Sequence, residues 1–458
     1  MKPNAAAFDA SLSSVAGIAW PPLPAGEAAY LAALMYQLES TQWLPADALV
    51  RRQHEQLVHT ARHAETYSPY FRGRMQAAGL RPEHLATEEG LRRLPVMRRR
   101  HLQSAGETLF CTQIPRAHAP VAEGRSSGSS GEPVLVKRTA INRLMWMAMT
   151  LREHLWQKRD FQSKLAFIRA FVDAGGVDLP TWGPPAALLF ETGTSHAFAI
   201  TADLAQQYDW LVSINPDYLL VYPTDLAALL NLFERRGQRL ARLRQIRTIG
   251  ETLSGGIRES ARRVLGVDIC DVYSSEEVGV IAQQCPVSGL YHVMAESMIV
   301  EILDQQGEPC APGEIGRVVV TDLHNLATPL IRYDLGDYAE MADACSCGRG
   351  LPALKRIVGR ERNMVRLPDG TTHWALVGTY RYRDIAPITQ YQLVQCERDL
   401  VEVRLVTDAP LTAEQEAQLA RVVREALGFP FRLRFAYFDG DIPRGPGGKF
   451  EEFVCLIA

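Results

Sequence analysis

The chain has 458 residues, of which 47% are hydrophobic and 22% charged, a composition typical of globular proteins with more than one domain. Its formal net charge of -3 excludes the overall basic field with which proteins bind nucleic acid or anionic membranes. No apolar stretch approaches the ~20 residues that span a bilayer, no signal-peptide pattern opens the chain, and the 8 cysteines are too sparse for a disulfide scaffold, so we expect a cytoplasmic protein.

Helical periodicity dominates residues 26–110. One long apolar-periodic stretch runs from Ala28 to Leu57, and a second covers residues 59–80. The run MRRRH at 97–101 predicts the solvated start of a helix, because no aromatic residues interleave with its arginines as they would in a nucleic-acid patch.

The segment RSSGSSGEPV at 125–134 is rich in serine and glycine and precedes the strand-like residues 134–140. The backbone N–H groups and hydroxyls of such a loop can clamp a polyphosphate, and a flexible linker is the alternative. No GK[ST] follows, so the segment is not a Walker loop. An amphipathic helix is expected over residues 141–155.

Helical patterns then alternate with short apolar runs at 218–223, 246–251 and 267–273, which predicts a layered α/β sheet. Two antiparallel strands are expected within 291–303 and 316–323.

The sequence pattern changes near Gly359–Asn363. The residues after this point predict a small α+β domain of about 100 residues, which is large enough for a hydrophobic core of its own. A hairpin is expected over 390–406, and a helix over 412–428, where Thr412 is a plausible N-cap. The alternation in 432–438 predicts a strand that turns three side chains to one side: Leu433, Phe435 and Tyr437.

Three further motifs carry charged residues in places where chemistry could use them. Glu277 in DVYSSEEVG follows an apolar strand, where a carboxylate can hold Mg²⁺, although an exposed helix start is the alternative. Asp337 follows a glycine and can accept hydrogen bonds from a ribose, or form an ordinary turn. Lys449 stands in the loop IPRGPGGKFEE, as a mobile point charge or as a surface lysine.

In this order and at this spacing the motifs resemble those of the adenylate-forming superfamily of acyl- and aryl-CoA ligases, and more closely its phenylacetate–CoA ligase branch. SSGSSGEP is similar to the family's phosphate loop SSGTTGKP, YSSEE to YGxTE, YDLGD to YRTGD, GRERNM to the hinge GRxDDM, and GPGGK to TxSGK. Four further segments resemble sequence motifs of this branch: YSPYFRGRM, INPDYLLVYPTDLAAL, CPVSGLYHV and CSCGRGLP. The resemblance therefore covers nearly the whole chain from about residue 50.

The resemblance implies a large N-terminal α/β domain with layered sheets at 1–358 and a small, mobile α+β domain at 359–458. It implies ATP-dependent activation of a carboxylic acid, aromatic or arylalkyl, to an acyl-adenylate, followed by transfer to the thiol of coenzyme A. By similarity, Lys449 and Glu277 serve catalysis, with Mg²⁺ on Glu277. The ATP or AMP contacts implied are Ser126, Ser127, Gly128, Ser129, Ser130, Gly131, Gly250, Glu251, Tyr273, Ser274, Ser275, Asp337 and Arg360.

The chain departs from the family pattern at three places. Glu132 stands where many members have lysine, and Arg362 where an aspartate is usual. After the hinge, the expected stretch that shapes the thiol tunnel is missing, and THWALVG, with His373 and Trp374, takes its place. Transfer to an amine or a carrier-protein thiol therefore stays open, as does a non-catalytic acyl-nucleotide binder.

Two short clusters, CPVSGLYH and CSC, place Cys285, His292, Cys345 and Cys347 as ligands of a structural Zn²⁺, and a similar site is implied for some relatives in the branch. Ordinary buried cysteines are the alternative, since C-x-C is tighter than the usual C-x₂-C. No nucleic acid or membrane partner is expected, and a homodimer is left open.

Overall fold

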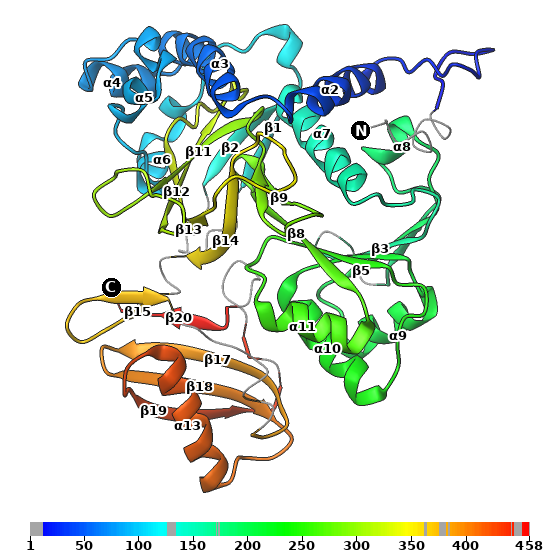
Figure 1. Ribbon diagram of the computed structural model, residues 1–458, viewed down its shortest axis with the longest axis vertical. Coiled ribbons are helices and arrows are strands. Elements are labelled where there is room, and N and C mark those ends of the chain that lie inside the picture. The colour runs from blue at the N-terminus through cyan, green and yellow to red at the C-terminus, as the bar shows by residue number, and fades with distance from the viewer. Residues whose placement is uncertain are drawn as a thin grey trace.

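The computed structural model describes residues 12–125, 134–170, 172, 175–360, 364–374, 382, 385–440, 442–443 and 451–457. Most of its strands join one sheet of 12 strands in the order β11-β12-β13-β14-β10-β9-β8-β7-β6-β3-β5-β4 (Figure 1). A separate sheet of 4 strands, in the order β19-β18-β17-β20, lies below it in Figure 1. The mixed α/β class predicted from the sequence is confirmed.

The N-terminal helices lie above the large sheet and along its left side (Figure 1). They are α2 (Glu27–Thr41), α3 (Ala46–Tyr67), α4 (Pro69–Ala77), α5 (Glu88–Arg92) and α6 (Arg99–Ala105), with short 3₁₀ turns at Pro82–Ala86, Gly106–Leu109 and Arg116–His118. The apolar-periodic stretch from Ala28 is two helices rather than one, because Pro45 holds an extended conformation (φ -56°, ψ 148°) at the start of α3. No described helix is long and apolar enough to cross a bilayer.

The centre of the large sheet is parallel, with β7 paired to β6 on one side and to β8 on the other. Helices α10 and α11 contact each other, and their buried residues share one apolar cluster with those of β6 and β7. The elements of this half are β3 (Leu165–Arg169), β4 (Val177–Leu179), α8 (Ala186–Leu189), β5 (Ser195–Ala199), α9 (Leu204–Ile214), β6 (Tyr218–Val221), α10 (Pro223–Arg236), β7 (Gln245–Ile249), α11 (Gly255–Leu265) and β8 (Asp268–Ser275).

Beyond β8 the sheet becomes antiparallel, and β11 pairs with β12 as the sequence predicts. Residues 291–303 form two strands rather than one, however, because β10 pairs with β9 and β14 instead. This half comprises β9 (Gly279–Gln284), β10 (Tyr291–Val293), β11 (Met298–Leu303), β12 (Ile315–Asp322), β13 (Tyr333–Met341) and β14 (Ala353–Arg360). The hairpin of β1 (Val121–Arg125) and β2 (Leu135–Thr139) leads into α7 (Ala140–Trp156). The second half of α7 is buried on nearly all sides rather than amphipathic, and even Arg152, Glu153 and His154 are buried there.

The C-terminal sheet has its own apolar core, which includes Leu393, Val403, Leu419 and Phe431. The predicted hairpin is β17 (Ile388–Glu397) with β18 (Leu400–Thr407), and Thr412 caps α13 in a capping box as expected. Tyr437 of the edge strand β19 is 38% exposed, and its hydroxyl donates to Glu416 of α13. The elements are β15 (Met364–Arg366), β16 (Thr372–Trp374), β17, β18, α13 (Ala413–Leu427), β19 (Arg432–Phe438) and β20 (Phe453–Cys455).

Candidate active site

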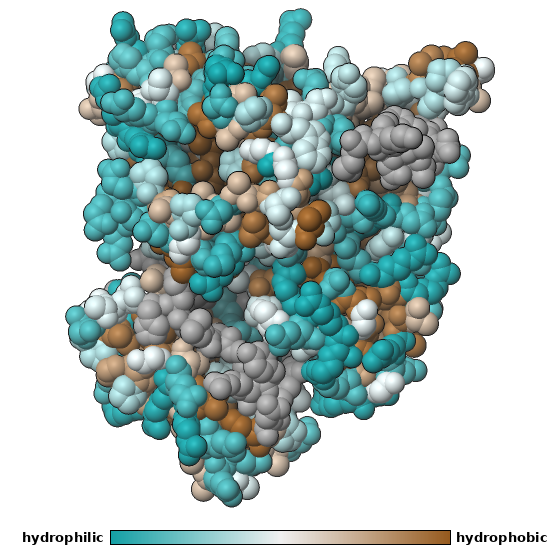
Figure 2. All heavy atoms as spheres, viewed as in Figure 1, coloured by the Kyte–Doolittle hydropathy of each residue, from teal (hydrophilic) through white to brown (hydrophobic). Residues whose placement is uncertain are grey.

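A cleft of about 1710 Å³ lies between the large sheet and the C-terminal sheet. Its walls come from the carboxyl ends of the parallel strands, from α7, from β13 and β14, and from the C-terminal residues Ile388, Tyr391 and Phe453. Figure 2 shows one face of the molecule, on which hydrophilic residues outnumber the hydrophobic ones interspersed among them. The carboxyl ends of parallel strands, where the sheet changes direction, are the usual ligand site of open α/β sheets.

One wall of the cleft is a three-residue polar chain that joins β8, β13 and β14. The Tyr273 hydroxyl donates to Asp337 Oδ2 at 2.8 Å, and Arg360 Nε donates to Asp337 Oδ1 at 3.2 Å. Burial alone lowers the pKa of Arg360, but the nearby carboxylates outweigh it and raise that pKa above its usual value. Each oxygen of Asp337 keeps a free lone-pair direction, so the carboxylate can still accept hydrogen bonds from a diol.

Glu277 lies in the turn between β8 and β9 and is only 8% exposed. Its Oε1 is 3.5 Å from Arg99 Nη1, in the first turn of α6. The neighbouring Glu276 faces Arg138 of β2, with 3.4 Å between Oε2 and Nη2. A carboxylate in the wall of the cleft fits Mg²⁺, which is usually held by one or two carboxylates together with substrate phosphates.

The sequence prediction missed Arg99. The run that contains it does begin a helix, but the Arg99 side chain is only 25% exposed and faces Glu277 rather than solvent. Nothing in the local pattern separates this arginine from its neighbours; only the packing of α6 against β13 brings it to the cleft.

The remaining predicted nucleotide contacts within the described part of the chain line the same cleft. Gly250 adopts a positive φ of 78° directly after β7, which turns the chain at the strand end. Glu251 Oε2 accepts from the backbone N and the hydroxyl of Thr224, at 3.0 and 2.7 Å. Ser274 and Ser275 end β8 beside them.

Two predicted groups lie outside the described residues: the serine-glycine segment Ser126, Ser127, Gly128, Ser129, Ser130 and Gly131, and Lys449. The strands on either side of the first segment pair antiparallel, with Arg125 opposite Leu135. The flanking strands β1 and β2 are therefore neighbours in one small sheet, and Arg125, at the end of β1, lines the cleft.

The four predicted metal ligands Cys285, His292, Cys345 and Cys347 lie together away from the cleft, with all ligand atoms within 4.8 Å of one another. Cys345 Sγ is 3.8 Å from Cys285 Sγ, and His292 Nε2 is 3.2 Å from Cys347 Sγ. Zn–S bonds of about 2.3 Å set S–S distances of about 3.8 Å in a tetrahedron. The donor set and its spacing fit a closed structural zinc site.

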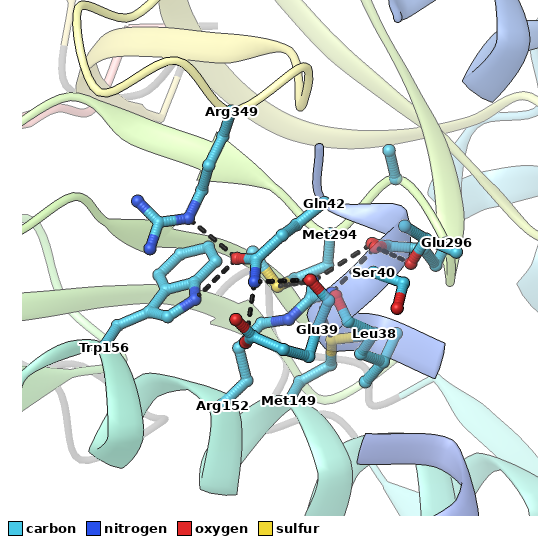
Figure 3. A network of polar contacts seen from close by, with 12 residues as sticks. Leu38, Glu39, Ser40, Gln42, Met149, Arg152, Trp156, Met294, Glu296 and Arg349 are labelled. Carbon is cyan, nitrogen blue, oxygen red and sulfur yellow. Dashed lines mark hydrogen bonds and ion pairs between the residues drawn. The ribbon is translucent and has the colours of Figure 1, made fainter. Parts of the chain in front are cut away.

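A polar network next to this cluster ties the end of α2 to α7 (Figure 3). Gln42 Oε1 accepts from Trp156 Nε1 at 2.9 Å and from Arg349 Nε at 2.8 Å. Arg152 of α7 makes two hydrogen bonds to Glu296, at 2.7 and 3.1 Å. The loop that carries the last two cysteines thus also holds the N-terminal helices.

No family model matches the chain. A phenylacetate–coenzyme A ligase of Thermus thermophilus is 24% identical over 462 residues, covering 92% of this chain and 100% of the relative. A phenylacetate–coenzyme A ligase of Escherichia coli is also 24% identical, over 72% of this chain and 75% of the relative.

Among solved structures, 2-hydroxyisobutyryl-CoA ligase in its postadenylation state matches with a TM-score of 0.72 at 18% identity, covering 90% of each chain. The same ligase in its thioesterification state gives 0.59, and the anthranilate-CoA ligase AuaEII gives 0.53. The chain therefore has the fold of the adenylate-forming CoA ligases, and in sequence it is similar to phenylacetate–coenzyme A ligases.

Proposed function

We propose that the protein is an AMP-forming acid–CoA ligase, which activates a small-molecule carboxylic acid with ATP and passes the acyl group to the thiol of coenzyme A. The observation that carries this proposal is the meeting of Tyr273, Asp337, Arg360 and Glu277 around one cleft, in a chain similar to phenylacetate–CoA ligases over 92% of its length.

In the first half-reaction a carboxylate oxygen of the acid attacks the α-phosphorus of ATP, and the bond to pyrophosphate breaks. Asp337 would accept the ribose hydroxyls, and Arg360 holds Asp337 in place. Glu277 would hold Mg²⁺, which would neutralise charge on the phosphate oxygens. Arg99 lies beside Glu277, where its guanidinium would meet the same phosphates once the metal occupies the carboxylate.

The division into domains at 1–358 and 359–458 is part of the proposal. In chain order, β14 is the last strand of the large sheet, and it ends at Arg360. The next long strand, β17, begins at Ile388 and belongs to a separate sheet. Lys449 belongs to this second part, which would bring its charge to the α-phosphate.

The acceptor is the step to test first. ATP–pyrophosphate exchange identifies an acid that the purified protein activates, and mass spectrometry after addition of coenzyme A then shows whether an acyl-CoA forms. We expect the acyl-CoA. Rapid ATP–pyrophosphate exchange without formation of an acyl-CoA, together with discharge of the adenylate by an amine or a carrier protein, would show that one of those is the acceptor instead of coenzyme A. Absence of exchange with every acid would leave only a non-catalytic acyl-nucleotide binder.

We also propose that Cys285, His292, Cys345 and Cys347 hold a structural Zn²⁺. Protein purified without a metal-affinity column should contain about one zinc per chain, the stoichiometry of a single closed site. Cys345→Ala should lose the metal, while Cys396→Ala, which changes a cysteine of the C-terminal sheet, should keep it. Metal-free wild-type protein would refute the site. A homodimer stays a prediction, which analytical ultracentrifugation would test.

A further inference from the structure

One face of helix α7 contributes a row of three side chains to the wall of the cleft: Trp146, Thr150 and His154. Residues four apart on a helix lie one above the other at about 1.5 Å of rise per residue, so the row is about 12 Å long. Trp182 and Ile249 also line the cleft, and both pack in one apolar cluster with buried residues of α7. This part of the cleft is therefore aromatic with few polar groups, the usual form of a site for a small organic molecule.

The two ends of α7 lie beside different parts of the cleft. Just before its start, Arg138 of β2 pairs with Glu276, next to the predicted magnesium carboxylate. Near its other end, Glu153 accepts from the Cys270 thiol at 3.2 Å. Cys270 precedes Tyr273 by three residues of β8, which is about 10 Å along the strand. The last side chain of the row belongs to the residue after Glu153, so there is room for one ring between it and the predicted nucleotide contacts.

His154 is a neutral imidazole that carries its proton on Nε2. Arg159 Nη1 lies 2.9 Å from Nδ1 of this ring, and Nδ1 accepts because a guanidinium can only donate. Burial, and after it the charge of Arg159, lower the pKa of His154 to about 3, so the ring is uncharged at neutral pH. Its Nε2 has no hydrogen-bond partner among the described residues and is not one of their fully buried polar atoms. The ring of Trp182 packs 5.6 Å away and helps to hold the imidazole in place.

The hydroxyl of Thr150, one turn before His154, lacks a partner as well. Thr150 is 5% exposed, and its Oγ1 makes no hydrogen bond within the described part of the chain. Arg247, which also lines the cleft, is by contrast in an ion pair with Glu153, at 2.9 Å between Nε and Oε2. Because buried polar groups are nearly always hydrogen-bonded, two unpartnered groups on one helix face point to a polar atom that a ligand supplies.

We propose that the acid taken by this protein carries an oxygen atom on its ring, remote from the carboxylate, and that His154 Nε2–H donates a hydrogen bond to this oxygen. The inference rests on the proposed adenylation function. The indole rings of Trp146 and Trp182 suit an aromatic ring. A neutral donor suits a neutral acceptor such as a phenolic hydroxyl, because His154 offers no charge to offset an ionised group. His154 thus determines specificity and takes no part in the chemical step.

The test is ATP–pyrophosphate exchange with acids that differ in one substituent. They are meta- and para-hydroxyphenylacetate, meta- and para-methylphenylacetate, in which a methyl group of similar size replaces the hydroxyl, and phenylacetate. We expect kcat/KM for the better hydroxy acid to exceed that for its methyl partner about tenfold or more, because the methyl group leaves a buried donor unpaired. Exchange measures adenylation alone, so the result does not depend on the acceptor.

Two variants connect this preference to His154. His154→Phe keeps an aromatic ring but has no donor, so the ratio of hydroxy to methyl acid should fall to one or below. His154→Gln can still accept from Arg159 and donate to a ligand, and it should lower the ratio by a smaller factor. The ratio is measured within one preparation, so a general loss of active protein does not change it. His59→Gln, at an exposed position of α3, is the control and should leave the ratio unchanged.

A wild-type ratio below about threefold, less than one hydrogen bond usually contributes, would overturn this inference and leave the proposed function standing. A ratio unchanged in each His154 variant that folds would overturn it too. Exchange with none of these aryl acids but with an acid of another class would have the same meaning. Exchange with no acid at all would overturn the proposed function, and the inference with it.

Discussion

Tyr273 connects the core of the large sheet to the carboxylate predicted to bind ribose. Its ring is 8% exposed and packs in an apolar cluster with Ile281 and Tyr291, while its hydroxyl donates to Asp337. The hydroxyl is held protonated, because burial and the Asp337 charge raise its pKa well above the usual value. The hydrogen bond therefore persists over the working pH range and fixes one oxygen of Asp337.

Tyr273→Phe should raise the apparent KM for ATP by about 2- to 10-fold, the equivalent of one hydrogen bond, with a smaller effect on kcat. Initial rates at varied ATP measure this. Tyr36→Phe, at a residue 78% exposed on α2, is the matched control. An unchanged KM for ATP in Tyr273→Phe would mean that the chain Tyr273–Asp337–Arg360 does not serve the nucleotide.

Asp322 lies at the end of β12, outside the cleft, and should make the stability of the protein depend on pH. Burial raises its pKa from 3.8 to about 6, although its Oδ1 accepts from the backbone of His324 and Asn325. The folded state favours the neutral carboxyl, so the stability that this group contributes is complete below its unfolded pKa and is lost as the pH rises through about 6.

Asp322→Asn keeps an acceptor oxygen but cannot ionise. The stability of this variant relative to wild type should therefore rise by about 2 kcal/mol between pH 4.5 and 7.5, and its Tm should rise with it, since the whole shift of about two pKa units is worth about 3 kcal/mol and part of that is already lost at pH 4.5. Asp343→Asn, at an exposed position, corrects for the change of net charge. A difference in Tm that does not vary with pH would show that Asp322 ionises normally in the folded protein.

At the scale of single elements, the loop between Cys345 and Leu351 does more than carry two cysteines. Gly350 donates to the Gln42 carbonyl at 3.0 Å, and a Cβ at this position would lie 1.7 Å from the Leu44 carbonyl oxygen. Only glycine lets the loop approach the break between α2 and α3 so closely.

Gly350→Ala should destabilise the protein by more than about 3 kcal/mol, because backbone atoms rather than a flexible side chain must move. Gly73→Ala in α4 has nothing within 4 Å of the new methyl group and should be neutral or stabilising by up to about 1 kcal/mol. Thermal unfolding of both variants measures the contrast. Equal Tm values would show that the loop packs more loosely than described.

Periodicity predicted the helices and strands well where one segment alone decides the structure, as in α13 with its capping box and in the β17–β18 hairpin. The break at Pro45 and the buried second half of α7 depend on packing against elements distant in sequence, and no local pattern reveals them. The site shows the same limit. Motifs located Tyr273, Glu277 and Asp337, whereas Arg99 and Arg247 reach the cleft only through the tertiary fold.

At the scale of the whole molecule, the cleft has walls from both sheets, so its chemistry depends on how the C-terminal part meets the large one. Lys449→Ala should lower acid-dependent pyrophosphate release by on the order of 10²–10³, the loss typical when one preorganised charge is removed from a transition state. Lys355→Ala removes an exposed lysine from the margin of the same cleft and should change the rate by less than about threefold, as surface substitutions usually do. A Lys449→Ala rate within that range would remove Lys449 from the mechanism.

The order along the chain of the residues that line the cleft has a consequence for evolution. Trp146, Trp182 and Ile249, which line the cleft, precede Tyr273, whereas the predicted ribose and magnesium contacts lie between Tyr273 and Arg360. Arg99 and the predicted phosphate segment 126–131 also precede α11 (Gly255–Leu265). A recombination event within α11 would therefore exchange them together with these wall residues, and the phosphate contacts and the magnesium carboxylate would then come from two different parents.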